Sequence, residues 1–322
     1  MKNKLLKNML VPGICALLAV ALPALLIRAE IIDAYTAQIM ALSVNMICGI
    51  TGQLSLGQAG FMAIGAYATI LLSTNAHVPL PVSILAAGIV TSFFGFLIGF
   101  PTLKLEGDYL AIVTLGFGEI IRVVLVNLKR WTGGPNGKQF PTALTLDPAL
   151  AYTVIVGTLV ALIILLQNFI RSTYGRAILA VREDEIAANA AGIDVFKYKM
   201  LGFVVASFVA GIGGALYAPF IGFVKPDQAS FTKSIDYLIF VVLGGMGSTT
   251  GSVLAAFVLT YVQEFLRFLQ NYRLLIYPVI LIIVMIFRPQ GLMGMKEFSF
   301  VRTFDKIASA LVRGKKTEAH NG

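Results

Sequence analysis

The sequence predicts an all-α polytopic membrane protein of about eight to ten transmembrane helices, with two segments broken by glycines. Two observations favour this class. Of the 322 residues, 57% are hydrophobic and only 13% are charged, about half the charged fraction of a soluble domain. Residues 34–103 contain no Asp, Glu, Lys or Arg, and uncharged stretches of this length are typical of membrane spans.

Ten apolar runs are candidate spans. In chain order they are residues 10–27, 32–48, 59–72, 81–100, 109–126, 152–170, 201–223, 235–243, 252–269 and 274–287. The first run follows three lysines, as in a secretory signal, but it is longer than a usual signal core, so we interpret it as a retained span. Several runs are short, and eight or nine crossings remain an alternative. We expect residues 1–291 to form the transmembrane domain and residues 292–322 a basic cytoplasmic tail.

The distribution of basic residues predicts the orientation. Ten crossings place both termini on one side, and Lys2, Lys4 and Lys7 before the first span assign that side to the cytoplasm. The basic residues of 171–199 and of 288–316 fall on the same side. The net charge of +9 therefore reflects membrane topology, and it does not indicate nucleic-acid binding.

Residues 171–199 form a dense polar block between two uncharged stretches, with nine charged residues among them. Residues 183–191 are predicted to form a short helix, because acidic residues favour its N-terminus and Gly192 favours its end. Three alanines would share a face that another surface could approach closely. The block is thus predicted to bind a soluble partner; an ordinary solvated loop is the alternative. The candidate residues of this helix are Glu183, Asp184, Glu185, Ala187, Ala190, Ala191 and Gly192.

Glycines interrupt two hydrophobic segments, residues 45–68 and 243–255. Irregular backbone within a membrane is tolerated only where protein buries it or where it lines a watery cavity. A pair of such segments, one in each half of a chain, is typical of a translocation pathway. Close helix packing by small residues is the alternative. The candidate pathway residues are Asn45, Gly52, Gln53, Ser55, Gly57, Gln58, Gly244, Gly245 and Gly247.

Other kinds of chemistry find little support in the sequence. Cys15 and Cys48 lie in apolar stretches, and His77 and His320 are too far apart to form a cluster, so neither a metal, a cofactor nor a catalytic set is expected. Within spans, Glu119 and Arg122 are three residues apart, as are Glu264 and Arg267, so each pair can neutralise itself. A G-x-x-x-x-G-K-[ST] phosphate loop is absent from the sequence, which means that this chain cannot hydrolyse ATP by that route.

Several motifs resemble one known family. They are GQLSLGQAGFMAIGAY (52–67), LEGDYLAIVTLGFGEIIR (105–122), TGGPNG (132–137), the run from YGRAILAVREDEIAANAAGI onward (174–218) and VLGGMGSTTGSVLAA (242–256). Together they are similar to the permeases of branched-chain amino-acid ABC transporters over roughly residues 43–291. GDYLAIVTLGFGEI and TGGPNG favour the M-type subunit over the shorter H-type subunit.

The resemblance implies a multi-pass subunit of the bacterial inner membrane that imports Leu, Ile and Val. The expected partners are an H-type permease subunit, two ATP-binding cassette subunits and a periplasmic or tethered solute-binding protein. It also implies that residues 171–199 are the cytoplasmic loop that couples to the ATPases, with Arg176, Arg182 and the residues from Glu183 to Gly192 as the coupling residues. Related permeases for urea or amides are an alternative, as is a secondary carrier that works alone. A carrier would need an ionisable or cation-binding site near the midplane, and copurification with ATPase subunits would distinguish the two classes.

Overall fold

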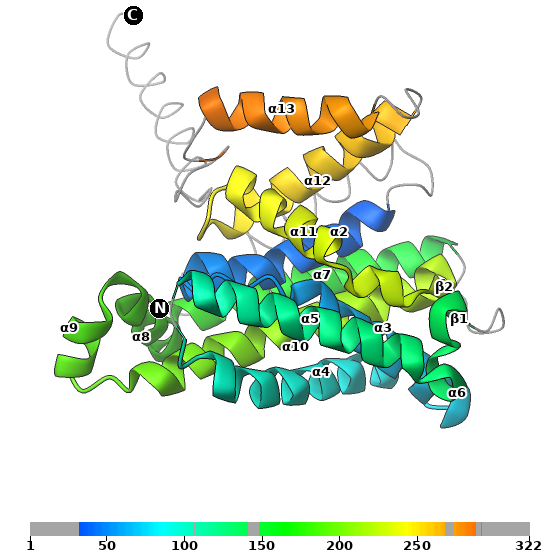
Figure 1. Ribbon diagram of the computed structural model, residues 1–322, viewed down its shortest axis with the longest axis horizontal. Helices are drawn as coiled ribbons and strands as arrows, with labels where there is room; N and C mark the ends of the chain where they lie inside the picture. The colour runs from blue at the N-terminus through cyan, green and yellow to red at the C-terminus, as the bar shows by residue number, and fades with distance from the viewer. Residues whose placement is uncertain (1–31, 106, 141–147, 268–272, 288–290, 292–322) are drawn as a thin grey trace, which may run out of the picture.

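The computed structural model describes residues 32–105, 107–140, 148–267, 273–287 and 291. The predicted first span, 10–27, and the predicted tail, 292–322, lie outside these residues. Within them the chain is almost entirely helical (Figure 1).

The helices of the bundle match the predicted spans. They are α2 (Ile32–Val44) with η2 (Asn45–Ile50), α3 (Gln58–Asn75), α4 (Leu80–Thr102), α5 (Asp108–Asn127), α7 (Pro148–Arg171), α10 (Val195–Ile221), α11 (Phe231–Gly244), α12 (Thr249–Phe265) and α13 (Arg273–Phe287). Among the described residues, four helices are long and apolar enough to cross a membrane by length and composition: α4, α5, α7 and α10. The predicted fold class, an all-α polytopic membrane protein, is confirmed.

Short elements lie at the two ends of the bundle. At one end are α8 (Thr173–Glu183) and α9 (Glu185–Ala190). At the opposite end are α6 (Lys129–Thr132), η3 (Gly134–Asn136), η5 (Pro226–Ala229) and two short strands, β1 (Lys138–Gln139) and β2 (Phe223–Val224). The strands pair antiparallel, with Lys138 opposite Val224. Figure 1 shows α8 and α9 at the left of the molecule and the strands at the right.

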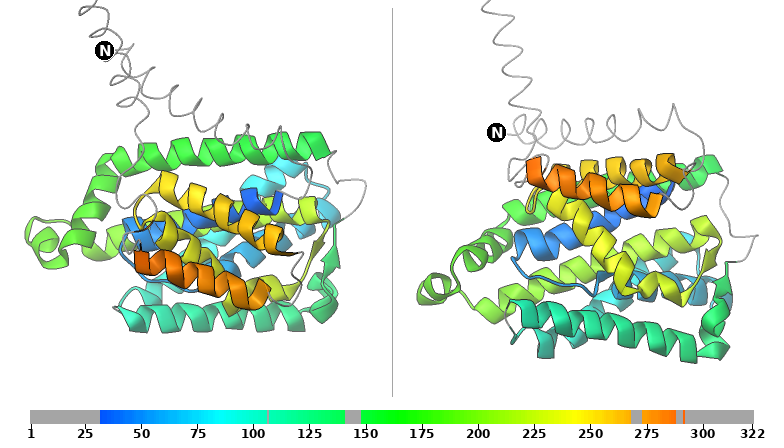
Figure 2. Two further views of the ribbon diagram at one scale, coloured as in Figure 1. Left: turned by 90° about the horizontal axis from the view of Figure 1, so that it is seen from above. Right: turned by 45° about the horizontal axis from the view of Figure 1, so that its top comes forward.

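The core is built around α2 and α10. Every described side chain of α2 is buried, including Tyr35, Ile39 and Met40, as expected for a helix that is apolar on all sides. α10 packs against α2, α3 and α4. Figure 2 shows α7, in green, along one flank of the bundle and α5, in teal, along the opposite flank.

Small residues let α3 and α10 approach closely. A Cβ added to Gly65 would collide with the backbone of Gly211, so glycine allows the two helices to touch. Nearby, the rings of Phe61 and Phe203 meet edge to face, with centroids 5.7 Å apart. The alternative interpretation by helix packing therefore applies to Gly65.

The outer surface of the bundle is apolar. On α4, Ile89, Phe93, Phe96 and Phe100 are all more than half exposed. A continuous apolar surface of this kind is unfavourable in water and suits a lipid environment. The exposed face of α4 thus agrees with a membrane-spanning position.

Candidate functional site

The polar block folds into two helices rather than one. Glu183 ends α8, and the carboxylate of Asp184 accepts hydrogen bonds from the backbone N–H groups of Ile186 and Ala187, both at 2.9 Å. A side chain in this position caps a helix that begins at the next residue. The predicted helix over 183–191 is therefore wrong at its start: it begins at Glu185, because Asp184 is the N-cap. Gly192 directly follows the C-cap Ala191.

One face of α9 is attached to the bundle and the other is exposed. Lys199 of α10 forms an ion pair with Glu185 at 2.5 Å, and Ala188 is buried. Ala187, Ala190 and Ala191 are exposed. Ile186 is 84% exposed, so its apolar side chain is available to a partner.

The first glycine break follows a buried π-helix. η2 is buried at every residue, and π-helical turns are rare and frequent at functional sites. Gly52 has a φ of +70°, a left-handed conformation that glycine adopts without a steric penalty. The chain then runs without helix to Gly57, the N-cap of α3. Ser55, within this stretch, is buried.

The second break lies between α11 and α12. Gly245 and Gly247 have φ values of +107° and +91°. Gly244, by contrast, is the last residue of α11, and a Cβ there would lie 2.5 Å from the carbonyl oxygen of Gly251. Close packing of α11 on α12 thus accounts for Gly244, and the break itself spans Gly245–Ser248.

The two breaks meet, although their residues are far apart in sequence. The backbone N–H of Gly247 donates to the side-chain oxygen of Asn45 at 2.9 Å. Asn45 is almost fully buried. This hydrogen bond joins the π-helix before the first break to the turn of the second.

Two glutamines beside the first break have free hydrogen-bonding groups. Among the described residues, neither amide atom of Gln53 has a partner, and the same holds for Nε2 of Gln58. Oε1 of Gln58 accepts from the hydroxyl of Ser43 at 3.0 Å. Buried polar atoms without partners cost free energy. Both glutamines can therefore gain hydrogen bonds from a polar solute or from water.

The two arginines of α8 have different surroundings. Arg176 is exposed, and its guanidinium lies 3.4 Å from the hydroxyl of Thr173. Arg182 is partly buried, and its Nη1 donates to the carbonyl oxygen of Gly49 at 2.5 Å. The polar block and the first break, which were predicted as separate sites, are therefore in direct contact.

The charges within the helices form local pairs, as their spacing predicted. Arg122 contacts Glu119 at 2.7 Å, and Arg267 contacts Glu264 at 2.8 Å. No group of three His, Cys, Asp or Glu residues that could hold a metal ion occurs in the described part of the chain.

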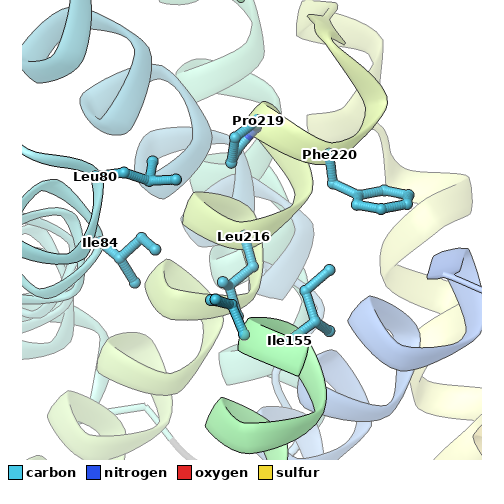
Figure 3. Close-up of a pocket in the computed structure, with 7 residues that line it drawn as sticks. Leu80, Ile84, Ile155, Leu216, Pro219 and Phe220 are labelled. Atoms are coloured by element: carbon cyan, nitrogen blue, oxygen red, sulfur yellow. The ribbon is translucent and has the colours of Figure 1, made fainter. Parts of the chain in front are cut away.

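Two pockets among the described residues lie away from the two breaks. A groove of about 400 Å³ runs between α4, α7 and α10 and is lined chiefly by apolar side chains such as Leu85, Leu162 and Phe208. A smaller pocket beside it is lined by Leu80, Ile84, Leu216 and their neighbours (Figure 3). Neither contains a predicted pathway residue, and both suit hydrocarbon rather than a polar solute.

Sequence reasoning missed three residues of this region. Gly49 was noticed as a glycine but not assigned, Ser43 was taken as part of a span, and Ile186 was overlooked. A signal for Ile186 was present, because it is the one large apolar residue between Glu185 and Gly192. The contact of Gly49 with Arg182 joins residues 133 positions apart, and local patterns do not reveal such pairs.

Comparison with known proteins identifies the family. Residues 26–287 match the family model described as branched-chain amino acid transport system / permease component. The high-affinity branched-chain amino acid transport system permease protein LivM of Salmonella typhimurium is 38% identical over 286 residues, covering 80% of this chain and 67% of the relative. LivM of Escherichia coli K12 is 37% identical over 310 residues, covering 86% and 73%.

More distant similarity extends to a second kind of permease. LivH of Escherichia coli K12, another high-affinity branched-chain amino acid transport system permease protein, is 26% identical over 170 residues, covering 52% of this chain and 54% of the relative. No solved structure matches the chain. The extent of the family match and of the LivM similarity shows that the chain belongs to the family of permease components of branched-chain amino acid transport systems.

Proposed function

We propose that this chain is the M-type permease subunit of an ATP-driven ABC importer that moves Leu, Ile and Val across the bacterial inner membrane. The observation that carries the proposal is the similarity to two LivM proteins over most of the chain. The fold supports it, since the two glycine breaks of the helical bundle meet beside a polar segment that can bind a soluble partner. Both termini would lie in the cytoplasm.

The energy would come from partner subunits. α8 and α9 are the proposed docking site for the ATP-binding cassette subunits, with Ile186 as the apolar anchor and the exposed alanines around it. Large apolar residues in a polar surround are typical of the centre of a protein interface. The proposed complex contains an H-type permease subunit, two ATPase subunits and a solute-binding protein, and this chain hydrolyses no ATP.

The opposite end of the bundle is the proposed docking surface for the solute-binding protein. It exposes Lys129, Arg130, Lys225 and Lys233, with Trp131 half exposed among them. Basic residues are usually depleted from the non-cytoplasmic side of a membrane protein. The presence of four basic residues at this end therefore suggests that they have a function there. Tryptophan and arginine are frequent in interface centres. The cluster would suit an acidic face of the binding protein, because opposite charges accelerate association.

The pathway is proposed to run along the first break. Asn45, Gly52, Gln53, Ser55, Gly57 and Gln58, with Gly244, Gly245 and Gly247, are the residues assigned to it or to its support. Both amide atoms of Gln53 and Nε2 of Gln58 have no partner among the described residues, and they could replace part of the hydration shell of an amino acid as it passes.

Copurification tests this proposal. The chain is expressed with its H-type partner and ATPase subunits, and a tag on this chain alone is used for purification in mild detergent. We expect the ATPase subunits in the eluate, with hydrolysis stimulated by the binding protein when it is loaded with leucine. A chain that purifies alone and transports solute in response to a proton or sodium gradient is a secondary carrier. Stimulation by urea- or amide-loaded binding protein instead of leucine-loaded protein would change the substrate class.

A further inference from the structure

Arg182 lies between the proposed ATPase docking helix and both glycine breaks. It belongs to the last turn of α8, two residues before Asp184, the N-cap of α9. No ion pair of Arg182 is found among the described residues. Its side chain turns inward, where Nη1 donates to the carbonyl oxygen of Gly49. Arg176 of the same helix, by contrast, is exposed.

The acceptor is a backbone carbonyl at the C-terminal end of η2. Carbonyls in the last turn of a helix lack partners within that helix, and they carry partial negative charge. A guanidinium satisfies such a carbonyl and strengthens the contact through its own charge. Arg182 thus caps the π-helix from a segment that lies outside the bundle core.

The glycines of both breaks leave space for this side chain. A Cβ on Gly52 would lie 2.9 Å from Cγ of Arg182, and a Cβ on Gly247 would lie 3.2 Å from Nη1. The first distance is shorter than real Cβ contacts, and the second is tighter than most of them. Arg182 therefore occupies a slot that one glycine from each break keeps open.

Gly247, which borders this slot, also donates the hydrogen bond to Asn45. A Cβ on Gly49 would collide with both Asn45 and Gly247. A displacement of Arg182 would thus change the end of η2 and the Gly247 turn together, since these groups touch one another as well as the guanidinium.

We propose that Arg182 is a positioning residue that couples movement of α8 and α9 to the two glycine breaks. The proposal rests on the proposed function, in which ATPase subunits move these helices. Docked ATPases would shift α8, α8 would carry the guanidinium with it, and the ends of η2 and of the second turn would follow. Glycine adopts left- and right-handed conformations about equally readily, and π-helical turns are frequent at functional sites. These segments therefore suit an element that alternates between two arrangements.

The test compares Arg182→Gln and Arg182→Lys with Lys197→Gln in the complete complex with its H-type partner, ATPase subunits and binding protein. Lys197 provides the matched control, because it is an exposed cation of the same polar block but belongs to α10, outside the proposed docking helices α8 and α9. The measurements are the amount of ATPase subunit recovered, the ratio of ATP hydrolysis with and without leucine-loaded binding protein, and leucine uptake.

For Arg182→Gln we expect normal recovery of ATPase subunits but a stimulation ratio close to one, with uptake reduced about tenfold, in the range of typical coupling energies. Arg182→Lys should restore part of the stimulation ratio and part of the uptake, since lysine keeps the positive charge but lacks the planar guanidinium with its several donors. Reduced ATPase recovery in proportion to the loss of uptake would show that Arg182 is only a docking residue. In that case the proposed function would stand. Failure of the wild type and of Lys197→Gln to recover ATPase subunits would instead contradict the proposed function itself.

Hydrogen–deuterium exchange gives a second measurement that does not depend on transport. Loss of the guanidinium should raise exchange in peptides covering residues 45–57 and 243–251, including the N–H of Gly247, and leave α3 and α10 unchanged. A rise confined to residues 173–192 would overturn the proposal, because it would show that Arg182 stabilises only its own segment.

Discussion

Nη1 of Arg182 lies 2.5 Å from the carbonyl oxygen of Gly49, although 133 positions separate the two residues. The contact joins α8, at the surface, to a π-helix in the core. It gives the proposed docking site a direct physical connection to the proposed pathway.

Replacement of Ile186 by Asp should reduce recovery of ATPase subunits about tenfold. The side chain is 84% exposed, so the change removes no packing within the chain, and loss of a central apolar anchor costs more than ~1 kcal/mol of binding free energy. Recovery is measured by affinity purification in mild detergent. Ile221→Asp at the opposite end, where the side chain is also exposed, is the control. Equal recovery with Ile186→Asp and wild type would exclude Ile186 as an anchor.

Replacement of Asp184 by Ala should weaken α9 and lower leucine uptake. The carboxylate accepts two backbone hydrogen bonds at 2.9 Å, and loss of an N-cap costs about 1 kcal/mol. Asp184→Ser keeps an N-cap acceptor and should retain most of the uptake. The comparison of the two variants in one uptake assay separates capping from charge. If Ser is as harmful as Ala, the negative charge of Asp184 matters more than its capping.

Charge reversal at Lys129 and Arg130 should weaken the response to the solute-binding protein. Both side chains are exposed at the β1–β2 end, and loss of complementary charge slows association, most strongly at low salt. The concentration of binding protein needed for half-maximal ATPase stimulation should rise several-fold. Lys104→Glu, an exposed cation near the other end of α4, is the control. If the half-maximal concentration of binding protein is unchanged at low ionic strength, the β1–β2 end is not the docking surface.

Replacement of Gly65 by Ala should destabilise the bundle, whereas Gly157→Ala should not. A Cβ at Gly65 would meet the backbone of Gly211, which cannot move without separating α3 from α10, but Gly157 of α7 has open space around it. Overpacking typically costs about 1–3 kcal/mol, and Ala is a better helix former than Gly at an open site. Thermal unfolding in detergent measures both. Equal unfolding temperatures for the two variants would mean that the α3–α10 contact is looser than described.

The helices could be predicted from the sequence because a long apolar run in a membrane must satisfy its own backbone hydrogen bonds, which a helix does. α4 and α5, for example, each begin one residue before their predicted spans. Details that depend on one side chain were harder to predict. Glu183 and Asp184 are adjacent acidic residues, but only Asp184 caps α9, which shifts the helix start to Glu185.

The candidate site was predicted as two separate parts. Each glycine segment was recognised from its composition, and the turns at Gly52 and Gly247 have the left-handed conformations that favour glycine. The contact of these turns with Arg182 could not be predicted, because it depends on how α8 folds back against the bundle. Gly244 was predicted to belong to the break because it lies in a glycine-rich run. In the structure it is instead the last residue of α11 and packs against Gly251 of α12.

Leucine uptake into proteoliposomes tests the central claim most directly. The complete complex is reconstituted with ATP in the lumen and with binding protein and radiolabelled leucine outside, and ionophores abolish proton and sodium gradients. We predict accumulation of leucine that requires lumenal ATP, is competed by isoleucine and valine, and is unaffected by the ionophores. Accumulation without ATP that follows an imposed ion gradient, or no accumulation of leucine by an intact complex, would contradict the account.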